Sequence, residues 1–152
     1  MKRILLLALL GLTGAQPLMA DDPAPKTQYF TAAELAAQTS QPKDGLASSQ
    51  FLNGPGAHVY LIRRDKTGAT EVHMALNDII IVKSGHAKIT VGGQVSGNKQ
   101  EQPSEWRGGE IAGGKDFSLS PGDVLFIPAG IPHRVLVAPK ASVTYLAVKT
   151  AK

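Results

Sequence analysis

In this 152-residue chain, three side chains have types and spacing that are suited to chemistry. Glu71 and His73 form a close pair, and His133 lies much later in the sequence. Glu71 and His73 stand two residues apart, so on a β-strand they share one face, ~6.6 Å apart along it, and can point at one centre. His133 follows a stretch rich in proline and glycine. Imidazoles and carboxylates together suit either a metal site or acid–base catalysis.

The element that positions His133 is predicted to be a short strand between two tight turns. Pro121-Gly122-Asp123 suits a turn, because proline fixes φ at the second position and glycine accepts a positive φ at the third. The run from Val124 to Pro128 is apolar and too short for a stable helix, which predicts a buried strand. A second turn ends at Pro132 and places His133 at the start of the next strand. Such a stiff support removes rotational freedom from the imidazole before any ligand arrives.

This stretch resembles the second conserved motif of the cupin superfamily. The resemblance is carried by Gly122, Pro128, Gly130 and His133, which fill the fixed positions of that motif at the family's spacing. It implies an all-β protein, a single antiparallel jelly-roll β-barrel, in which His133 is a metal ligand. The alternative is that His133 only satisfies a hydrogen bond at the mouth of a barrel that holds no metal.

The region after residue 70 resembles the first cupin motif, with two departures. His73 and Gly85 match the second histidine and the glycine of the family pattern, whereas Glu71 replaces its first histidine and Asp78 replaces its glutamate. Asp78 is expected just after a hairpin turn, where the next strand runs back beside Glu71 and His73. Such a set would suit a divalent ion of the borderline N/O class, namely Mn²⁺, Fe²⁺, Ni²⁺ or Zn²⁺. The ligands predicted in this way are Glu71, His73, Asp78 and His133.

The two departures leave other roles open. Glu71 could be a catalytic acid or base instead of a ligand, because a carboxylate beside a half-filled pocket is where pKa tuning is feasible. Glu71 could also face solvent on an edge strand, while Asp78 caps a turn.

The strand predicted from His58 to Arg64 supplies two candidates for a substrate pocket. His58 and Tyr60 share one face of it, so both line the cavity if that face looks inward; His58 is then expected to support a ligand and not to be one. Further strands are predicted at 70–75, 79–83, 86–91, 117–119 and 143–148. The segment 94–115, which holds Trp106, is predicted to be an irregular loop that forms a lid or a subunit contact.

The N-terminal part predicts export. Residues 1–20 have the layout of a secretory signal peptide, with a basic start, an apolar run and a small residue at Ala20. Residues 21–44 form a leader and a short helix from Ala32 to Thr39, whose capping box is Thr31 and Glu34, and residues 45–152 form the cupin-like barrel. We expect a soluble periplasmic or secreted protein with no membrane contact after signal removal; an uncleaved N-terminal anchor is the alternative.

Composition narrows the functional classes. The chain has no cysteine, which removes disulfides and thiolate zinc sites, and its net charge of +4 gives no electrostatic footprint for nucleic acid once Lys2 and Arg3 leave with the signal peptide. Edge strands of a small barrel would be protected in a homodimer. The sequence therefore predicts an exported small cupin that binds a divalent metal and a small polar molecule, as an oxygenase, isomerase or lyase. The alternative is a non-catalytic cupin that binds a small ligand without metal, so the sequence does not decide whether the protein is an enzyme.

Overall fold

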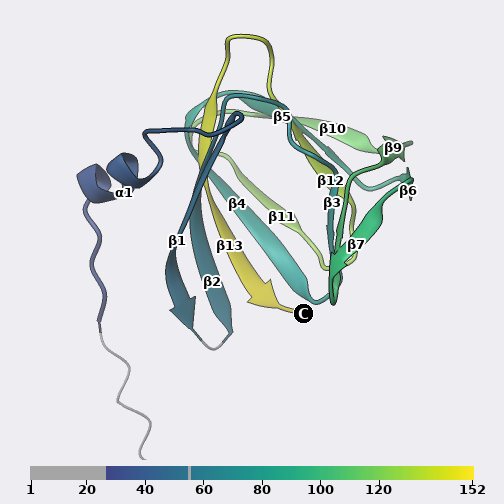
Figure 1. Cartoon of the computed structure of the whole chain (residues 1–152), viewed down its shortest axis with the longest axis horizontal. Helices are drawn as coiled ribbons and strands as arrows, with labels where there is room; N and C mark the ends of the chain where they lie inside the picture. Colours follow the sequence, from purple (N-terminus) through teal and green to yellow (C-terminus); the bar gives the residue numbers. More distant parts are fainter. Residues whose placement is uncertain (1–26, 55) are drawn as a thin grey trace, which may run out of the picture.

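Two antiparallel sheets face each other in the computed structural model, which describes residues 27–54 and 56–152 (Figure 1). The proposed signal peptide and the start of the leader lie outside these residues. The described residues form the following elements: α1 (Ala32–Gln38), β1 (Leu46–Gly54), β2 (Ala57–Arg64), β3 (Glu71–His73), β4 (Leu76–Gly85), β5 (Ala87–Val91), β6 (Gln94–Ser96), β7 (Lys99–Gln102), β8 (Glu105–Arg107), β9 (Glu110–Ala112), β10 (Lys115–Leu119), β11 (Val124–Ile127), β12 (His133–Leu136) and β13 (Val143–Ala151).

The strands divide between a five-stranded and a six-stranded sheet. The five-stranded sheet has the order β1-β2-β13-β4-β11, and the six-stranded sheet has the order β10-β5-β12-β3-β8-β7. Strands β6 and β9 form a separate two-stranded ribbon at one end of the six-stranded sheet (Figure 1). Strands that are distant in sequence, such as β4 and β13, lie side by side, with one register shift between Thr144 and Tyr145. This arrangement confirms the predicted antiparallel jelly roll.

The core lies between the two sheets and fills one part of the barrel. On β4, Ile80 and Val82 point inward and are 3% and 2% exposed, because alternate residues of a strand face opposite sides. They pack with Ile89 of β5 and Val135 of β12 from the facing sheet. Each such side chain contributes roughly 1.5–3 kcal/mol when it is fully buried. The remainder of the interior is a cavity lined by both polar and apolar side chains.

The turn–strand–turn prediction around His133 is confirmed, but the predicted burial of the strand is wrong, because β11 lies at a sheet edge and leaves Val124 and Phe126 exposed. Gly122 and Gly130 have φ angles of +93° and +82°, in the left-handed region that favours glycine. Between them β11 pairs with β4, and β12 begins at His133 as predicted. The amide of Gly130 also donates a hydrogen bond to the carbonyl of His73, 2.8 Å away. The turn before His133 is therefore fastened to the strand that carries His73.

The predicted hairpin between residue 73 and residue 78 is wrong. Strand β3 belongs to the six-stranded sheet and pairs with β8 and β12, whereas β4 belongs to the five-stranded sheet and pairs with β13 and β11. The chain crosses from one sheet to the other at Met74 and Ala75. Asp78 thus faces Glu71 and His73 across the interior and does not lie beside them, because inward faces of two packed sheets meet in the same space.

Two further segments differ from prediction. The segment 94–115 is not an irregular loop, because it contains β6, β7, β8 and β9. These strands are too short to give a periodic signal in the sequence, and glycines lie at the turns between them. The stretch 46–54, where no strand is predicted from the sequence, forms the edge strand β1 through pairing with β2. In both segments, backbone pairing with a neighbour overrides weak local preference.

The N-terminal helix agrees with prediction. Helix α1 begins after Thr31, whose side chain accepts a hydrogen bond from the amide of Glu34, and the Glu34 carboxylate accepts one from the Thr31 amide. The preceding Phe30 packs edge-on against Phe51 of β1, with ring centroids 5.1 Å apart. The helix lies outside the barrel, next to β1 (Figure 1). Within the described residues, no helix is long and apolar enough to cross a membrane.

Candidate metal centre

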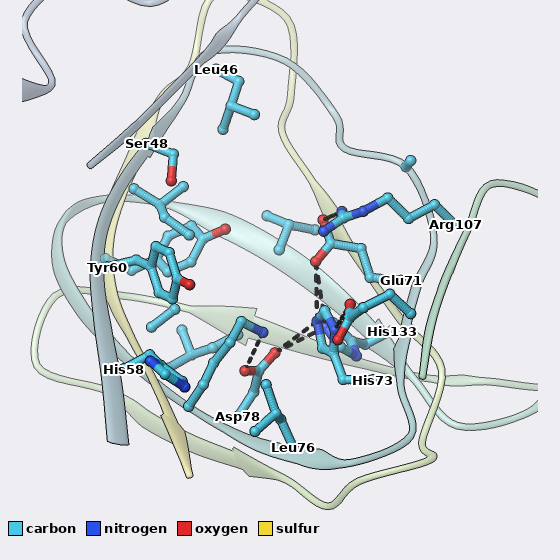
Figure 2. Close-up of a pocket in the computed structure, with 18 of the residues that line it drawn as sticks. Leu46, Ser48, His58, Tyr60, Glu71, His73, Leu76, Asp78, Arg107 and His133 are labelled. Atoms are coloured by element: carbon cyan, nitrogen blue, oxygen red, sulfur yellow. Dashed lines mark hydrogen bonds and ion pairs between the residues drawn. The ribbon is translucent and has the colours of Figure 1, made fainter. Parts of the chain in front are cut away.

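A cavity of about 410 Å³ lies between the inner faces of the two sheets. The predicted site residues all reach it. Figure 2 shows His58 and Tyr60 of β2 on one side, across the cavity from Glu71 and His133. His58 is fixed by a hydrogen bond between its Nδ1 and Oδ1 of Asn53, 2.6 Å away. The cavity is therefore wide enough for a small molecule between a polar cluster and the β2 wall.

The polar cluster brings together the four residues that the sequence singled out, although their roles remain predictions. Nε2 of His73 lies 3.4 Å from Oε2 of Glu71 and 3.3 Å from Oδ2 of Asp78. Nε2 of His133 lies 4.0 Å and 3.4 Å from the same two oxygens. One ligand atom each from Glu71, His73 and His133 lies within 4.8 Å of the other two. Asp78 borders this group of three.

Both imidazoles present Nε2 to the centre because their Nδ1 atoms are held from behind. Nδ1 of His73 lies 2.5 Å from Oε2 of Glu105, and Nδ1 of His133 lies 3.2 Å from the carbonyl oxygen of Ile131. Carboxylate and carbonyl oxygens only accept hydrogen bonds, so each Nδ1 is the protonated nitrogen. In the neutral imidazoles, each Nε2 then carries the lone pair that a metal needs.

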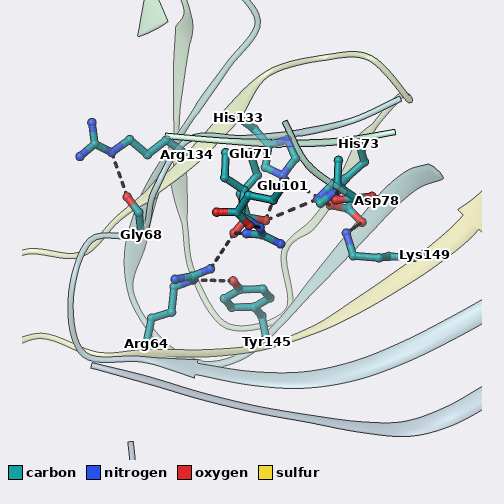
Figure 3. Close-up of polar contacts among 12 residues, drawn as sticks. Arg64, Gly68, Glu71, His73, Asp78, Glu101, His133, Arg134, Tyr145 and Lys149 are labelled. Carbon is teal, nitrogen blue, oxygen red and sulfur yellow. Dashed lines mark hydrogen bonds and ion pairs between the residues drawn. The ribbon is translucent and has the colours of Figure 1, made fainter. Parts of the chain in front are cut away.

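The two carboxylates are held in the same way, each by its outer oxygen (Figure 3). Oε1 of Glu71 lies 3.1 Å from Nη2 of Arg64 and 2.6 Å from Nη1 of Arg107. Oδ1 of Asp78 lies 2.6 Å from Nζ of Lys149. The inner oxygens, Oε2 and Oδ2, stay directed at the imidazoles.

The cations and imidazoles also govern the ionisation of the cluster. Burial alone would raise the pKa of Glu71 and of Asp78, but the imidazoles and the facing cations hold both values far below the usual range. Burial disfavours a charged His73, yet the carboxylates of Asp78 and Glu71 outweigh it and raise the pKa of His73 to about 9. Both carboxylates are therefore ionised at neutral pH, and a proton rests on His73 when no other cation is present.

The residues fit a divalent ion. Nε2 of His73 is buried and makes no well-directed hydrogen bond, although carboxylate oxygens of Asp78 and Glu71 lie 3.3 and 3.4 Å away, so these atoms surround a space that a cation can fill. Ligand atoms around an ion with bonds of about 2.1 Å lie about 3.0 Å apart in an octahedron and about 3.4 Å apart in a tetrahedron. Of the four contacts between an imidazole Nε2 and an inner carboxylate oxygen, those of 3.3, 3.4 and 3.4 Å match this range and the fourth, at 4.0 Å, is longer.

Sequence reasoning missed the residues that hold the cluster from outside, namely Arg64, Glu105, Arg107 and Lys149. Arg64 could have been found, because it continues the alternation of His58, Tyr60 and Ile62 on β2. Lys149 likewise continues the inward series of Tyr145 and Ala147 on β13. Glu105 and Arg107 lie in a three-residue strand inside the segment read as a loop, where no local signal predicts their direction.

Comparison with known families points to the same fold. Residues 34–151 match the family model of the JmjC domain. No curated protein matches the chain in sequence. The structure resembles a conserved protein with a double-stranded β-helix domain from Klebsiella pneumoniae, with 17% identity, a TM-score of 0.60 and coverage of 83% of this chain and 91% of that chain.

Two other solved structures are similar. A cupin superfamily protein from Desulfitobacterium hafniense has 15% identity, a TM-score of 0.54 and coverage of 84% of this chain and 94% of that chain. The DMSP lyase DddQ from Ruegeria pomeroyi has 18% identity and a TM-score of 0.52; the match covers 72% of this chain but only 48% of the lyase. At these identities the likeness shows the fold, and it confirms the cupin resemblance read from the sequence.

Proposed function

Because the chain belongs to the JmjC-domain family within the cupin superfamily, we propose that its cavity binds a divalent metal ion together with a small polar molecule. His73 and His133 would hold the ion through Nε2, and Glu71 through Oε2. The observation that carries this proposal is the buried Nε2 of His73, which has no hydrogen-bond partner while its Nδ1 is held by Glu105. This arrangement is typical of a metal-ligating histidine.

The set of two imidazoles and one carboxylate favours an ion that keeps open positions. This set is the one that non-haem Fe²⁺ oxygenases use, and Mn²⁺, Ni²⁺ and Zn²⁺ accept the same donors. A bound ion would polarise a carbonyl, carboxylate or hydroxyl oxygen of the second molecule. That chemistry serves an oxygenase, an isomerase or a lyase.

The protein groups have separate roles in this proposal. Glu71 acts as a ligand and not as a general base, because two guanidinium groups hold its Oε1 and its pKa lies far below the usual range. Asp78 lies close enough to both imidazoles to be a fourth ligand through Oδ2. His58 and Tyr60 line the opposite wall, where they would contact the small molecule.

A second candidate function is supported by the ionisation of His73. With a pKa of about 9, this imidazole is protonated at neutral pH and lies between two ionised carboxylates, so the cluster already contains a cation when no metal is bound. A non-catalytic cupin that binds a small polar ligand would not need a metal ion in this cluster.

Export and association complete the proposal. The signal peptide proposed at residues 1–20 would direct the protein to the periplasm or the exterior, and intact mass of the mature protein tests its removal.

A homodimer is favoured by the outer face of the five-stranded sheet. There Val124 and Phe126 of the edge strand β11 are 64% and 56% exposed, beside the outward Ile79 and Ile81 of β4.

The decisive experiment is metal binding by matched variants. Elemental analysis of the purified protein, followed by titration calorimetry with Mn²⁺, Fe²⁺, Ni²⁺ and Zn²⁺, should show one bound ion in the wild type. His133→Ala and His73→Ala should each weaken binding by at least about 100-fold, since they remove a ligand and not only its support. His86→Ala is the control, because His86 contacts Ser120 at 3.4 Å outside the cluster. Equally weak binding by the wild type and His133→Ala would favour the metal-free function.

A further inference from the structure

We propose that strand β8 is a positioning element for the metal centre, in which Glu105 and Arg107 set the orientation of His73 and Glu71. This inference rests on the proposed metal function. Strand β8 pairs with β3 so that Arg107 lies directly opposite Glu71 and Glu105 lies directly opposite His73. Side chains that face each other in an antiparallel pair start about 4.5–5.5 Å apart, which is within reach of direct contact.

Glu105 governs which nitrogen of His73 is available. Its Oε2 lies 2.5 Å from Nδ1 of His73, and the imidazole is only 4% exposed. Holding the proton on Nδ1 directs the lone pair of Nε2 to the cavity, and the negative charge behind the ring makes Nε2 a stronger donor. Without Glu105, a neutral His73 could place its proton on Nε2, and that proton would have to move to Nδ1 before Nε2 could bind metal, which weakens binding.

Arg107 governs which oxygen of Glu71 is available. Its Nη1 lies 2.6 Å from Oε1 of Glu71, and its Nε lies 3.2 Å from Oε2 of Glu101 on β7. Arg64 approaches the same Oε1 from the five-stranded sheet at 3.1 Å. With Oε1 held on two sides, Oε2 is the atom that faces the imidazoles.

The β7–β8 hairpin contributes little else to the fold. In the part of the chain that the structure describes, the core cluster between the sheets takes no side chain from β7 or β8. The residues of β7 are exposed and those of β8 are half-buried, with Trp106 opposite Val72 on the outer side. The cavity, however, is lined by Glu101, Gln102, Glu105 and Arg107. The hairpin thus affects the site far more than the core.

Paired substitutions separate positioning from folding. Glu105→Ala should weaken metal binding by about 10- to 100-fold, whereas Glu105→Gln, which keeps an acceptor for Nδ1, should recover most of the affinity. Arg107→Ala should also weaken binding, and Arg107→Lys should recover less than the glutamine variant does, since one ammonium does not reproduce the guanidinium fork. Glu110→Gln is the control, because Glu110 is exposed and pairs only with Arg134 at 3.0 Å.

Three measurements are needed for each variant: Zn²⁺ and Mn²⁺ affinity, the visible absorption of bound Co²⁺, and the melting temperature without metal. We expect altered affinity and an altered Co²⁺ spectrum in the alanine variants, and we expect Glu105→Gln to restore both whatever its effect on the melting of the metal-free protein. Unchanged affinity and spectrum would overturn the inference. Equal loss in Glu105→Ala and Glu105→Gln together with a lower metal-free melting temperature would also overturn it, by showing a structural role. Failure of the wild type to bind any ion would instead defeat the proposed function.

Discussion

The two sheets contribute different parts of the polar cluster. The six-stranded sheet supplies Glu71, His73 and His133 on the adjacent strands β3 and β12. The five-stranded sheet supplies Asp78 and, from β2 and β13, the cations Arg64 and Lys149. Donor atoms that must meet within a few ångströms thus come mainly from neighbouring strands of one sheet, where register fixes their spacing. Countercharges come largely from the facing sheet, where packing of the two layers brings them close.

Among substitutions that test this separation of roles between the two sheets, we expect the largest effect at Arg64. This arginine is buried, and it joins Glu71 at 3.1 Å to the hydroxyl of Tyr145 at 3.0 Å. Arg64→Met would leave Glu71 with one cation, and breaking a buried ion pair costs about 3–5 kcal/mol of unfolding free energy. Urea unfolding of the metal-free protein measures this loss. Arg63→Met is the control, because its pair with Asp65 is far more accessible to solvent than that of Arg64 with Glu71 and should matter by less than about 1 kcal/mol. Equal effects of the two substitutions would contradict the division.

The pH dependence of metal binding depends on residues from both sheets. Asp78 of the five-stranded sheet and Glu71 of the six-stranded sheet together raise the pKa of His73 to about 9. The proton on His73 competes with the ion below this pKa, so metal affinity should rise about tenfold per pH unit between pH 6.5 and pH 8.5. The metal-free protein should behave in the opposite sense. Its stability from His73 is present below the unfolded pKa near 6.5 and is lost as pH rises through 9.

Titration calorimetry across this pH range measures the change in metal affinity per pH unit. In Asp78→Asn, one of the two carboxylates that favour the proton is lost, so the rise in affinity should shift to lower pH. A slope that is flat from pH 6.5 upward in the wild type would contradict the raised pKa of His73.

Lys149 should have a smaller effect than Arg64. Its Nζ holds Oδ1 of Asp78 at 2.6 Å, and its side chain is 15% exposed. Lys149→Met leaves a buried carboxylate with one partner fewer, at a cost of about 1–3 kcal/mol. The double variant Lys149→Met with Asp78→Asn should recover part of that loss in thermal unfolding. If the double variant is as unstable as the sum of the two single variants, the pair does not act as a unit.

Substitutions on the outer faces of the two sheets should have the smallest effect on stability. The six-stranded sheet carries charged side chains outside, such as Lys88 and Asp116, 2.9 Å apart, whereas the five-stranded sheet exposes Val124 and Phe126. Phe126→Lys should shift the proposed homodimer to monomer in sedimentation at micromolar concentration while unfolding changes by less than about 0.5 kcal/mol. Lys88→Ala should leave the association unchanged. A monomeric wild type would refute the dimer.

Much of the site could be predicted because its signals are local. Glycines and prolines fix the turns on both sides of β11, and alternation along a strand places Glu71 and His73 on one face. These signals act within a few residues and need no knowledge of the fold. The family resemblance then gave the relation between the two motifs.

The remainder depends on contacts that no short stretch encodes. Asp78 was expected beside His73 in a hairpin, but it reaches the cluster from the opposite sheet, because the crossing at Met74 and Ala75 has no turn signal that marks a change of sheet. Glu105 and Arg107 are set by the register of β8 against β3, which is fixed only when the strands pair. Sequence alone could identify the candidate ligands, but not the residues that hold them.

The register pair between Glu71 and His133 limits how the chain can change in length. It is the pairing that joins β3 to β12 among the described residues, and both of its members face the cavity. Deleting one residue within β3 would turn an inward side chain outward, because successive residues of a strand alternate between faces. An insertion at 138–141, in the connection between β12 and β13 that extends beyond the sheets in Figure 1, would leave every register unchanged. Insertions and deletions should therefore accumulate in that connection and be excluded from the three residues of β3.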